Sequence, residues 1–203
     1  MAEKAKAHLG ARGHDVTETV VEESFDPEVE VRRHLDADLV VLQTSINWFG
    51  APWIYKRYVD EVFNAGLKSK KLLDNDGRTR SDPTRQYGTG GHMQGKGFFI
   101  AATWNAPADA FDNPDNTLFE GRSVDDLLLN ISSNYKFVGY TVLRSYGIYD
   151  IFGTTDVAAG IEDYAVHLDA QLMKLEAPTI QPMSGKASPH KGSPVPGSSL
   201  SVS

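Results

Sequence analysis

Two short runs of apolar residues stand out along the chain, at residues 37–43 (ADLVVLQ) and 97–103 (GFFIAAT). Their apolar character is continuous and does not alternate with polar residues. Strands of this kind are typical of parallel sheets, in which both faces are buried. We therefore predict two buried strands here, and a third strand within YTVLRSYGIY, residues 140–149.

Apolar residues at helical spacing predict helices between these strands. The clearest helix starts at Pro52 and repeats Tyr55, Val59 and Phe63 along one side, until Asn64-Ala65-Gly66 ends it. The other expected elements are helices at residues 2–9, 26–35, within 124–135 and 161–175, a strand at 14–21, and a long polar loop at 68–96. Strands that alternate with helices indicate an open, doubly wound α/β sheet, whose ligands bind beyond the carboxyl ends of its strands.

Length and composition limit the class of protein. The 203 residues suffice for one domain, which we place at residues 1–176, while residues 177–203 are rich in Pro, Ser, Gly and Lys and predict a disordered tail. A net charge of −7 disfavours nucleic-acid binding. The chain has no cysteine and its six histidines show no ligand spacing, so no metal site is predicted. Without a secretory signal or an apolar run of about 18 residues, we expect a cytoplasmic protein with no stable membrane insertion.

The two most apolar strands each run directly into a loop that contains Trp and Asn. These loops read SINWFGAPW, residues 45–53, and TWNAP, residues 103–107. If the strands are parallel, both loops emerge at the same edge of the sheet and bring together Asn47, Trp48, Phe49, Thr103, Trp104 and Asn105. Flat apolar rings beside amide and hydroxyl groups suit a planar heterocycle. The alternative, in which the tryptophans only cap the sheet, stays open.

Three stretches carry a family resemblance. QTSINWFGAPWIYKRYVDEVFNAG, DGRTRSDPTRQYGTGGHMQGK and TWNAPADAF, in this order and at this spacing, closely resemble the FAD-dependent NAD(P)H:quinone oxidoreductases of the modulator of drug activity B type. The resemblance covers the chain to about Leu175. It implies a flavodoxin-like fold, a homodimer with FAD near the subunit interface, and hydride transfer from NAD(P)H through FAD to a quinone.

The resemblance also implies site residues. By position, the FAD contacts are Ile46, Asn47, Trp48, Phe49, Tyr87, Thr103, Trp104, Asn105 and Ala106. Tyr87 is the candidate catalytic residue, because its hydroxyl can hydrogen-bond the flavin ring or the quinone oxygen. Where this chain has Ser45, Ile46 and Asn47, the family usually has the more aromatic PGWWMGAPW, so the detailed contacts differ. Arg78, Arg80, Arg85 and Lys96 suit NADPH phosphates, but a solvated loop explains them equally well.

The chain begins where the family is already inside its first helix. Relative to the family it lacks the first strand and the loop that receives the FAD phosphates at a helix N-terminus. Either the true start of the protein lies upstream of Met1, or the protein is a truncated relative with impaired folding or flavin binding. We therefore keep a second hypothesis, a non-catalytic flavodoxin-like protein that acts as a dimerising or regulatory partner. The sequence specifies neither the quinone nor a preference for NADH or NADPH.

Overall fold

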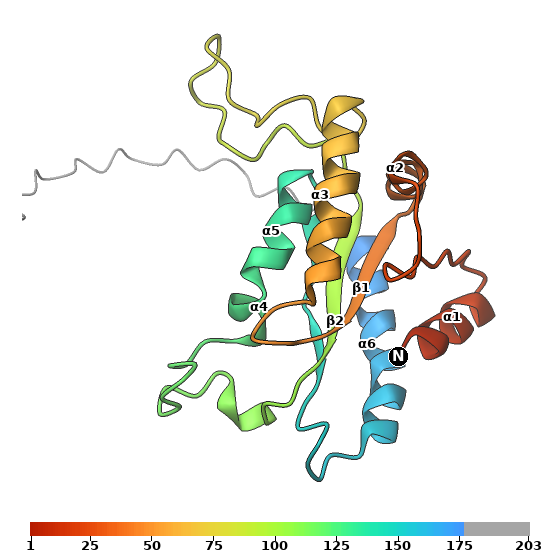
Figure 1. Cartoon of the computed structure of the whole chain (residues 1–203), viewed down its shortest axis with the longest axis vertical. Helices are drawn as coiled ribbons and strands as arrows, with labels where there is room; N and C mark the ends of the chain where they lie inside the picture. The colour runs from red at the N-terminus through yellow and green to blue at the C-terminus, as the bar shows by residue number, and fades with distance from the viewer. Residues whose placement is uncertain (177–203) are drawn as a thin grey trace, which may run out of the picture.

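The structure, a computed structural model, describes residues 1–176, and the predicted tail at 177–203 lies outside the described residues. Its centre is a parallel sheet of β1 (Leu39–Ser45), β2 (Gly97–Thr103), β3 (Thr141–Val142) and β4 (Tyr146–Ile148). Strand β2 pairs with β1 on one side, with Leu39 opposite Gly97, and with β3 and β4 on the other. The predicted open α/β sheet is confirmed (Figure 1).

Helices cover both faces of this sheet. Successive residues of β2 point to opposite faces, so the strand contributes side chains to a core on each side. Phe98, Ile100 and Ala102 pack in the larger core, whereas Phe99 and Ala101 pack in the smaller one. The larger core lies under α2 (Pro27–Asp36), α3 (Trp53–Lys68), α4 (Val124–Leu127) and α5 (Leu129–Phe137); the smaller lies under α1 (Ala2–Ala11) and α6 (Val157–Glu176). A short 3-10 helix, η1 (Ala108–Ala110), follows β2. No helix within residues 1–176 has both the length and the apolar character needed to cross a bilayer.

The predicted strands agree with the structure to different degrees. Strand β2 has the predicted limits, and every residue from Gly97 to Ala102 is buried. Strand β1 is only partly buried, contrary to the prediction, because within the described residues no strand pairs with its outer edge. The third predicted strand is divided into β3 and β4, both paired with β2.

The predicted strand at residues 14–21 is wrong. The segment passes from α1 to α2 without joining the sheet, and side chains hold it instead. Lys6 contacts Glu18, and the Thr19 hydroxyl donates to Glu30 on α2 at 2.8 Å. Its alternating pattern favours a strand, but a strand also needs a neighbour that accepts and donates backbone hydrogen bonds.

Helix α3 continues two residues beyond the predicted end. Gly66 lies inside the helix and is buried, and its lack of a side chain serves packing. A β-carbon added there would lie 2.4 Å from Cδ1 of Leu72, which folds back over the helix after Lys68. The glycine marks a close approach of two segments and not the helix end.

A buried polar network joins α2 to α3 and to the segment before β3. The hydroxyl of Tyr58 donates to Glu30 Oε2 at 3.0 Å and lies 3.1 Å from Nε2 of His34, whose Nδ1 lies 2.9 Å from the hydroxyl of Tyr140. Both ring nitrogens of His34 therefore have partners. Burial lowers the pKa of His34 to about 4, and the nearby Glu30 carboxylate opposes that shift. The imidazole is neutral at neutral pH.

Candidate functional site

The loop after β1 closes in a tight turn. The Ile46 amide donates to the Thr103 carbonyl at 3.0 Å, which ties the loop to the end of β2. Asn47 and Gly50 then exchange backbone hydrogen bonds of 2.8 and 3.1 Å. Between them, Trp48 and Phe49 have positive φ values of 50° and 66°. A two-residue turn of this kind normally takes Asn-Gly or Gly-Gly at its centre.

Two consecutive aromatic residues in the left-handed region carry strain of about 1–2 kcal/mol each. The strained turn keeps the Trp48 side chain 95% exposed and Phe49 about half exposed. It also leaves two donors available: among the described residues, the amides of Trp48 and Phe49 meet no hydrogen-bond acceptor. Strained backbone concentrates at binding sites, where the surrounding structure holds it in place.

The loop after β2 forms the opposite, rigid wall. The Trp104 amide donates to the Ile148 carbonyl at 2.8 Å, and the Trp104 carbonyl accepts from Ile151 at 3.2 Å. The Trp104 ring is only 2% exposed, and it packs edge-on against Phe111 at 5.0 Å. Phe111 in turn stacks on Phe119 at 4.9 Å. The indole Nε1 of Trp104 is buried and has no acceptor within the part of the chain that the structure describes.

Between these two loops lies a pocket of about 550 Å³ at the carboxyl end of the sheet. Six of the predicted residues line it, namely Ile46, Trp48, Phe49, Trp104, Asn105 and Ala106. Asn47 and Thr103 do not line it, because Asn47 closes the turn and Thr103 ends the strand. The expected meeting of the two loops at one edge is therefore observed, and binding by these residues stays a prediction.

Sequence reasoning missed one side of the pocket. The residues after the TWNA stretch complete it, namely Pro107, Asp109, Ala110, Asn113, Asn116, Leu118 and Phe119. These residues could have been predicted from their position in the sequence, because the segment that contains them continues directly from the loop at the carboxyl end of β2. Of the residues that the structure describes, Asp109 is the only charged one that lines the pocket, and no Lys or Arg does so. The site therefore offers aromatic walls, amide groups and unused donors without a fixed positive charge.

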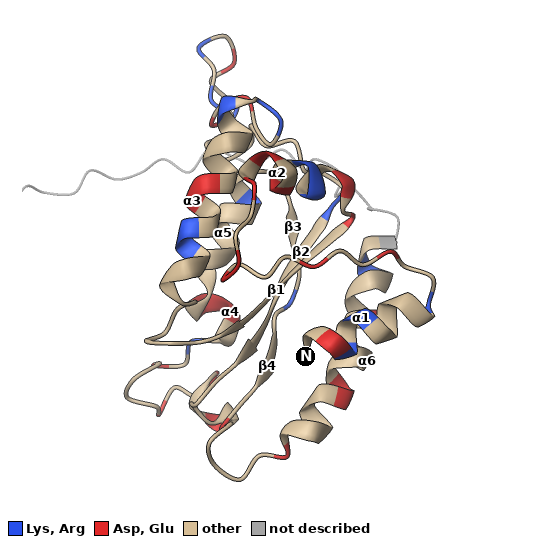
Figure 2. Ribbon diagram, turned by 45° about the vertical axis from the view of Figure 1, so that its right-hand side comes forward, with Lys and Arg blue, Asp and Glu red and all other residues tan. Residues whose placement is uncertain are grey.

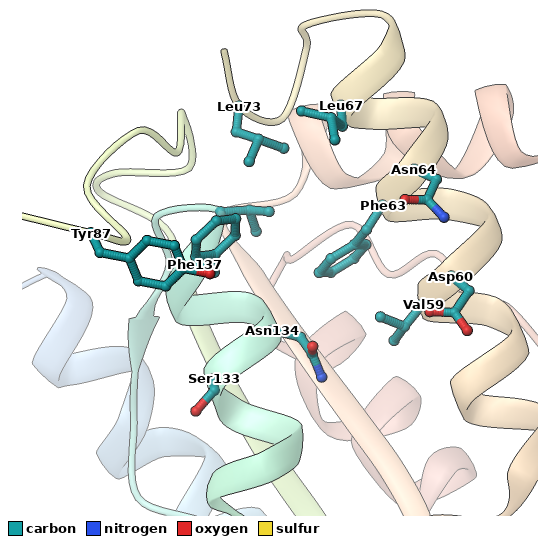
Figure 3. Close-up of a pocket in the computed structure, with 11 residues that line it drawn as sticks. Val59, Asp60, Phe63, Asn64, Leu67, Leu73, Tyr87, Ser133, Asn134 and Phe137 are labelled. Atoms are coloured by element: carbon teal, nitrogen blue, oxygen red, sulfur yellow. The ribbon is translucent and has the colours of Figure 1, made fainter. Parts of the chain in front are cut away.

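Tyr87 lies elsewhere. It belongs to the long loop that precedes β2, on the side of the strand's amino end. Strand β2, about 20 Å long, separates that end from the loop that Trp104 begins. Tyr87 lines a second pocket of about 400 Å³ between α3, α5 and the loop, together with Phe63, Leu67 and Phe137 (Figure 3). Within one chain, Tyr87 does not reach the aromatic pocket.

Two side chains contact the Tyr87 ring. Its centroid lies 5.2 Å from that of Phe137, and the Arg78 guanidinium lies over the ring, 5.3 Å from the centroid. Arg78 is itself held by Asp76 through a 2.6 Å contact between Nη2 and Oδ2. Tyr87 is nevertheless 66% exposed, so the loop presents the ring outward.

One of the basic residues considered for NADPH phosphates has a structural role. The Lys96 ammonium donates to the carbonyls of Leu35 and Ala37 at 2.8 and 2.7 Å, where α2 ends. A cation at this position stabilises the negative end of a helix dipole. Arg80 and Arg85 lie exposed in the loop.

Comparison with known proteins gives consistent results. The profile of a family described as flavodoxin-like fold matches residues 1–172. The chain is 39% identical over 166 residues to the NADPH:quinone oxidoreductase MdaB of Haemophilus influenzae, covering 82% of this chain and 85% of that protein. It is 40% identical over 165 residues to an uncharacterized protein of Schizosaccharomyces pombe, covering 81% and 83%. Among solved structures, a Klebsiella pneumoniae protein assigned as a quinone reductase aligns with a TM-score of 0.66 at 21% identity, covering 87% of this chain and 78% of that one; at that identity the likeness shows the fold alone.

Proposed function

We propose that this chain, which belongs to the flavodoxin-like fold family, is a flavin-dependent oxidoreductase that transfers a hydride from NAD(P)H through FAD to a quinone. The observation that carries the proposal is the pocket in which the two Trp-containing loops meet, beyond the carboxyl ends of parallel strands. The related MdaB of H. influenzae, named as an NADPH:quinone oxidoreductase, supports the same reaction.

The residues of this pocket fit the ring of a flavin. Bound FAD supplies the hydride chemistry, and the protein orients the ring and adjusts its polarity. The amides of Trp48 and Phe49 have no acceptor among residues 1–176, so they can donate to the polar edge of the ring and stabilise negative charge there. Trp104 and Phe119 supply the apolar wall, and the exposed ring of Trp48 can cover the bound heterocycle and exclude water.

The same pocket does not fit a diphosphate. No cationic side chain within residues 1–176 lines it, and Asp109 would repel a phosphate. The flavin diphosphate must therefore be held by groups outside this pocket. The preference for FAD over FMN rests on the family resemblance, and the cofactor released from purified protein, separated by chromatography, identifies which one is bound.

Tyr87 can serve this site only from a second copy of the chain, since within one chain it lies at the far end of the sheet. The proposal therefore includes a homodimer in which the Tyr87 hydroxyl of one copy approaches the flavin or quinone of the other. Tyr87→Phe should lower turnover of quinone while flavin content stays the same. Unchanged turnover would remove Tyr87 from the mechanism.

The test of the proposed function is a spectrum followed by an assay. The purified chain should be yellow and should oxidise NADH or NADPH only when a quinone is added, and comparison of the two donors gives the preference. Phe49→Ala should release flavin, whereas the control Phe152→Ala, at an exposed residue outside the pocket, should not. A colourless folded dimer that remains colourless after incubation with FAD and FMN would instead support the non-catalytic partner.

A further inference from the structure

The aromatic pocket has an inner and an outer pair of apolar side chains, and its two walls contribute one residue to each pair. Phe49, from the turn after β1, meets Phe119, from the loop after η1, edge-to-face with the ring centroids 6.0 Å apart. Trp48 and Leu118 precede these two residues in the sequence and line the same pocket. Trp48 is 95% exposed and Leu118 is 61% exposed, whereas Phe119 is buried. The pocket therefore has an apolar rim, formed by Trp48 and Leu118.

The loop that carries Leu118 holds this side chain outward. The side-chain oxygen of Asn116 accepts from the amides of Leu118 and Phe119 at 3.1 and 2.9 Å. Phe119 turns inward and stacks on Phe111, with the ring centroids 4.9 Å apart. Because one turn fixes both residues, Leu118 stays exposed at the rim. Exposed apolar groups beside a pocket, surrounded by polar residues, are typical of a binding groove.

The surroundings of the rim are acidic. Asp112, Asp115 and Glu120 belong to the same loop as Leu118, and Figure 2 shows acidic residues on the loops at this end of the sheet. Arg122 is the only basic residue between β2 and α4, and it donates to Glu120 at 2.8 Å. These charges repel an anionic group at the rim, whereas an uncharged chain is not repelled. The rim therefore suits an apolar substituent.

We propose that the rim selects among quinones by their substituent, and that the quinone this site uses best carries an uncharged alkyl chain. The chain lies on Trp48 and Leu118, while the quinone ring lies deeper in the pocket. In this role Leu118 is a specificity-determining residue, because it contacts the substituent and not the reacting ring. The inference rests on the proposed function, since it concerns the substrate of the same site.

Matched quinones test the proposal. Two naphthoquinones that carry a methyl or a hexyl group at the same carbon share their ring and differ by five methylene groups. Each half-buried methylene strengthens binding about twofold, so wild type should prefer the hexyl compound in kcat/KM at least about tenfold. A chain of equal length that ends in a carboxylate should bring no such gain, because the acidic loop repels it.

Substitution of Leu118 tests the assigned residue. Leu118→Ser should lower the hexyl-to-methyl ratio of kcat/KM at least about threefold, whereas Leu118→Met, which keeps an apolar side chain, should preserve it. Leu129→Ser is the matched control, since Leu129 is also 61% exposed but lies outside the pocket. The ratio within one variant cancels any change in flavin content or hydride transfer, because both quinones meet the same enzyme.

A binding measurement requires no turnover. Equilibrium dialysis of the purified protein with each quinone, without NADH or NADPH, gives the two dissociation constants. Their ratio should show the same preference for the hexyl compound and the same loss in Leu118→Ser.

Several outcomes would overturn the proposal: equal use of the two quinones by wild type, an unchanged ratio in Leu118→Ser, an equal loss in Leu129→Ser, or a carboxylate-ended chain as favourable as the hexyl chain. These measurements also separate the inference from the proposed function. A protein that reduces both quinones without preference keeps the function and rejects the selective rim. A protein that reduces neither, but binds the hexyl compound through Leu118, rejects the reductase and keeps the rim.

Discussion

At the scale of the residue, the turn at Trp48 and Phe49 holds two aromatic residues in position at a cost in folding stability. Both residues have the backbone conformation that glycine adopts without cost, and the exposed Trp48 side chain gains little from packing in the free protein. The arrangement is explained if the pair is selected for what it binds.

Replacing Trp48 should therefore separate stability from binding. We expect Trp48→Gly to raise the free energy of unfolding of the flavin-free protein by about 1 kcal/mol, because the left-handed strain is released. The same variant should bind flavin more weakly. Urea unfolding and flavin titration measure the two effects. Phe152→Gly, at an exposed position without a positive φ, is the control and should not stabilise; a loss of stability in Trp48→Gly would show that the turn is not strained.

His34 should make the protein sensitive to mild acid. Its pKa falls from 6.5 to about 4 on folding because it is buried, so the unfolded chain binds a proton that the folded chain does not. The stability contributed by the neutral imidazole is complete above about pH 6.5 and decreases as the pH falls toward 4, by up to about 3 kcal/mol.

The measurement is urea unfolding of wild type and His34→Gln at several pH values between 7 and 4. The variant starts from a lower stability because it loses contacts with Tyr58 and Tyr140, but its stability should change less over this range. Equal slopes for the two proteins would show that His34 is not the group that titrates.

At the scale of the element, Gly66 and Gly10 both lie within helices, but their replacement by alanine should change stability in opposite directions. A β-carbon at Gly66 meets Leu72, whereas one at Gly10, in α1, meets nothing within 4 Å. Alanine is favoured over glycine in a helix by about 1 kcal/mol, and overpacking costs about 1–3 kcal/mol. Gly10→Ala should raise the melting temperature and Gly66→Ala should lower it. A stabilised Gly66→Ala would mean that Leu72 moves away at little cost.

The sequence predicts elements whose signals are local. The predicted limits of strand β2 agree with the structure at both ends, because its apolar run is continuous and is flanked by a polar loop and by Trp104. The strand expected at residues 14–21 failed because pairing depends on a distant partner. The same distinction applies to the site. Trp48 and Trp104 each follow a parallel strand and so were expected to meet, whereas Tyr87 precedes a strand and lies at the other edge.

At the scale of the whole molecule, the three tryptophans of the chain lie toward one end of the sheet. Trp48 and Trp104 line the aromatic pocket, and Trp53 opens the next helix. Intrinsic tryptophan fluorescence therefore reports that end alone. Titration with FAD should quench most of this emission, and Phe49→Ala should reduce the quenching. Flavin that binds without changing the emission would have its ring elsewhere.

The pairing of β1 with β2 has a consequence for the order in which the molecule is made. Leu39 finds its backbone partner at Gly97, so a ribosome must synthesise α3 and the entire Tyr87 loop before β1 can be held in place. Until then the newly made β1 and its aromatic turn lack the partner strand β2. Contacts between distant residues form slowly and leave apolar surface exposed for longer, so this pairing is most vulnerable between the synthesis of β1 and that of β2.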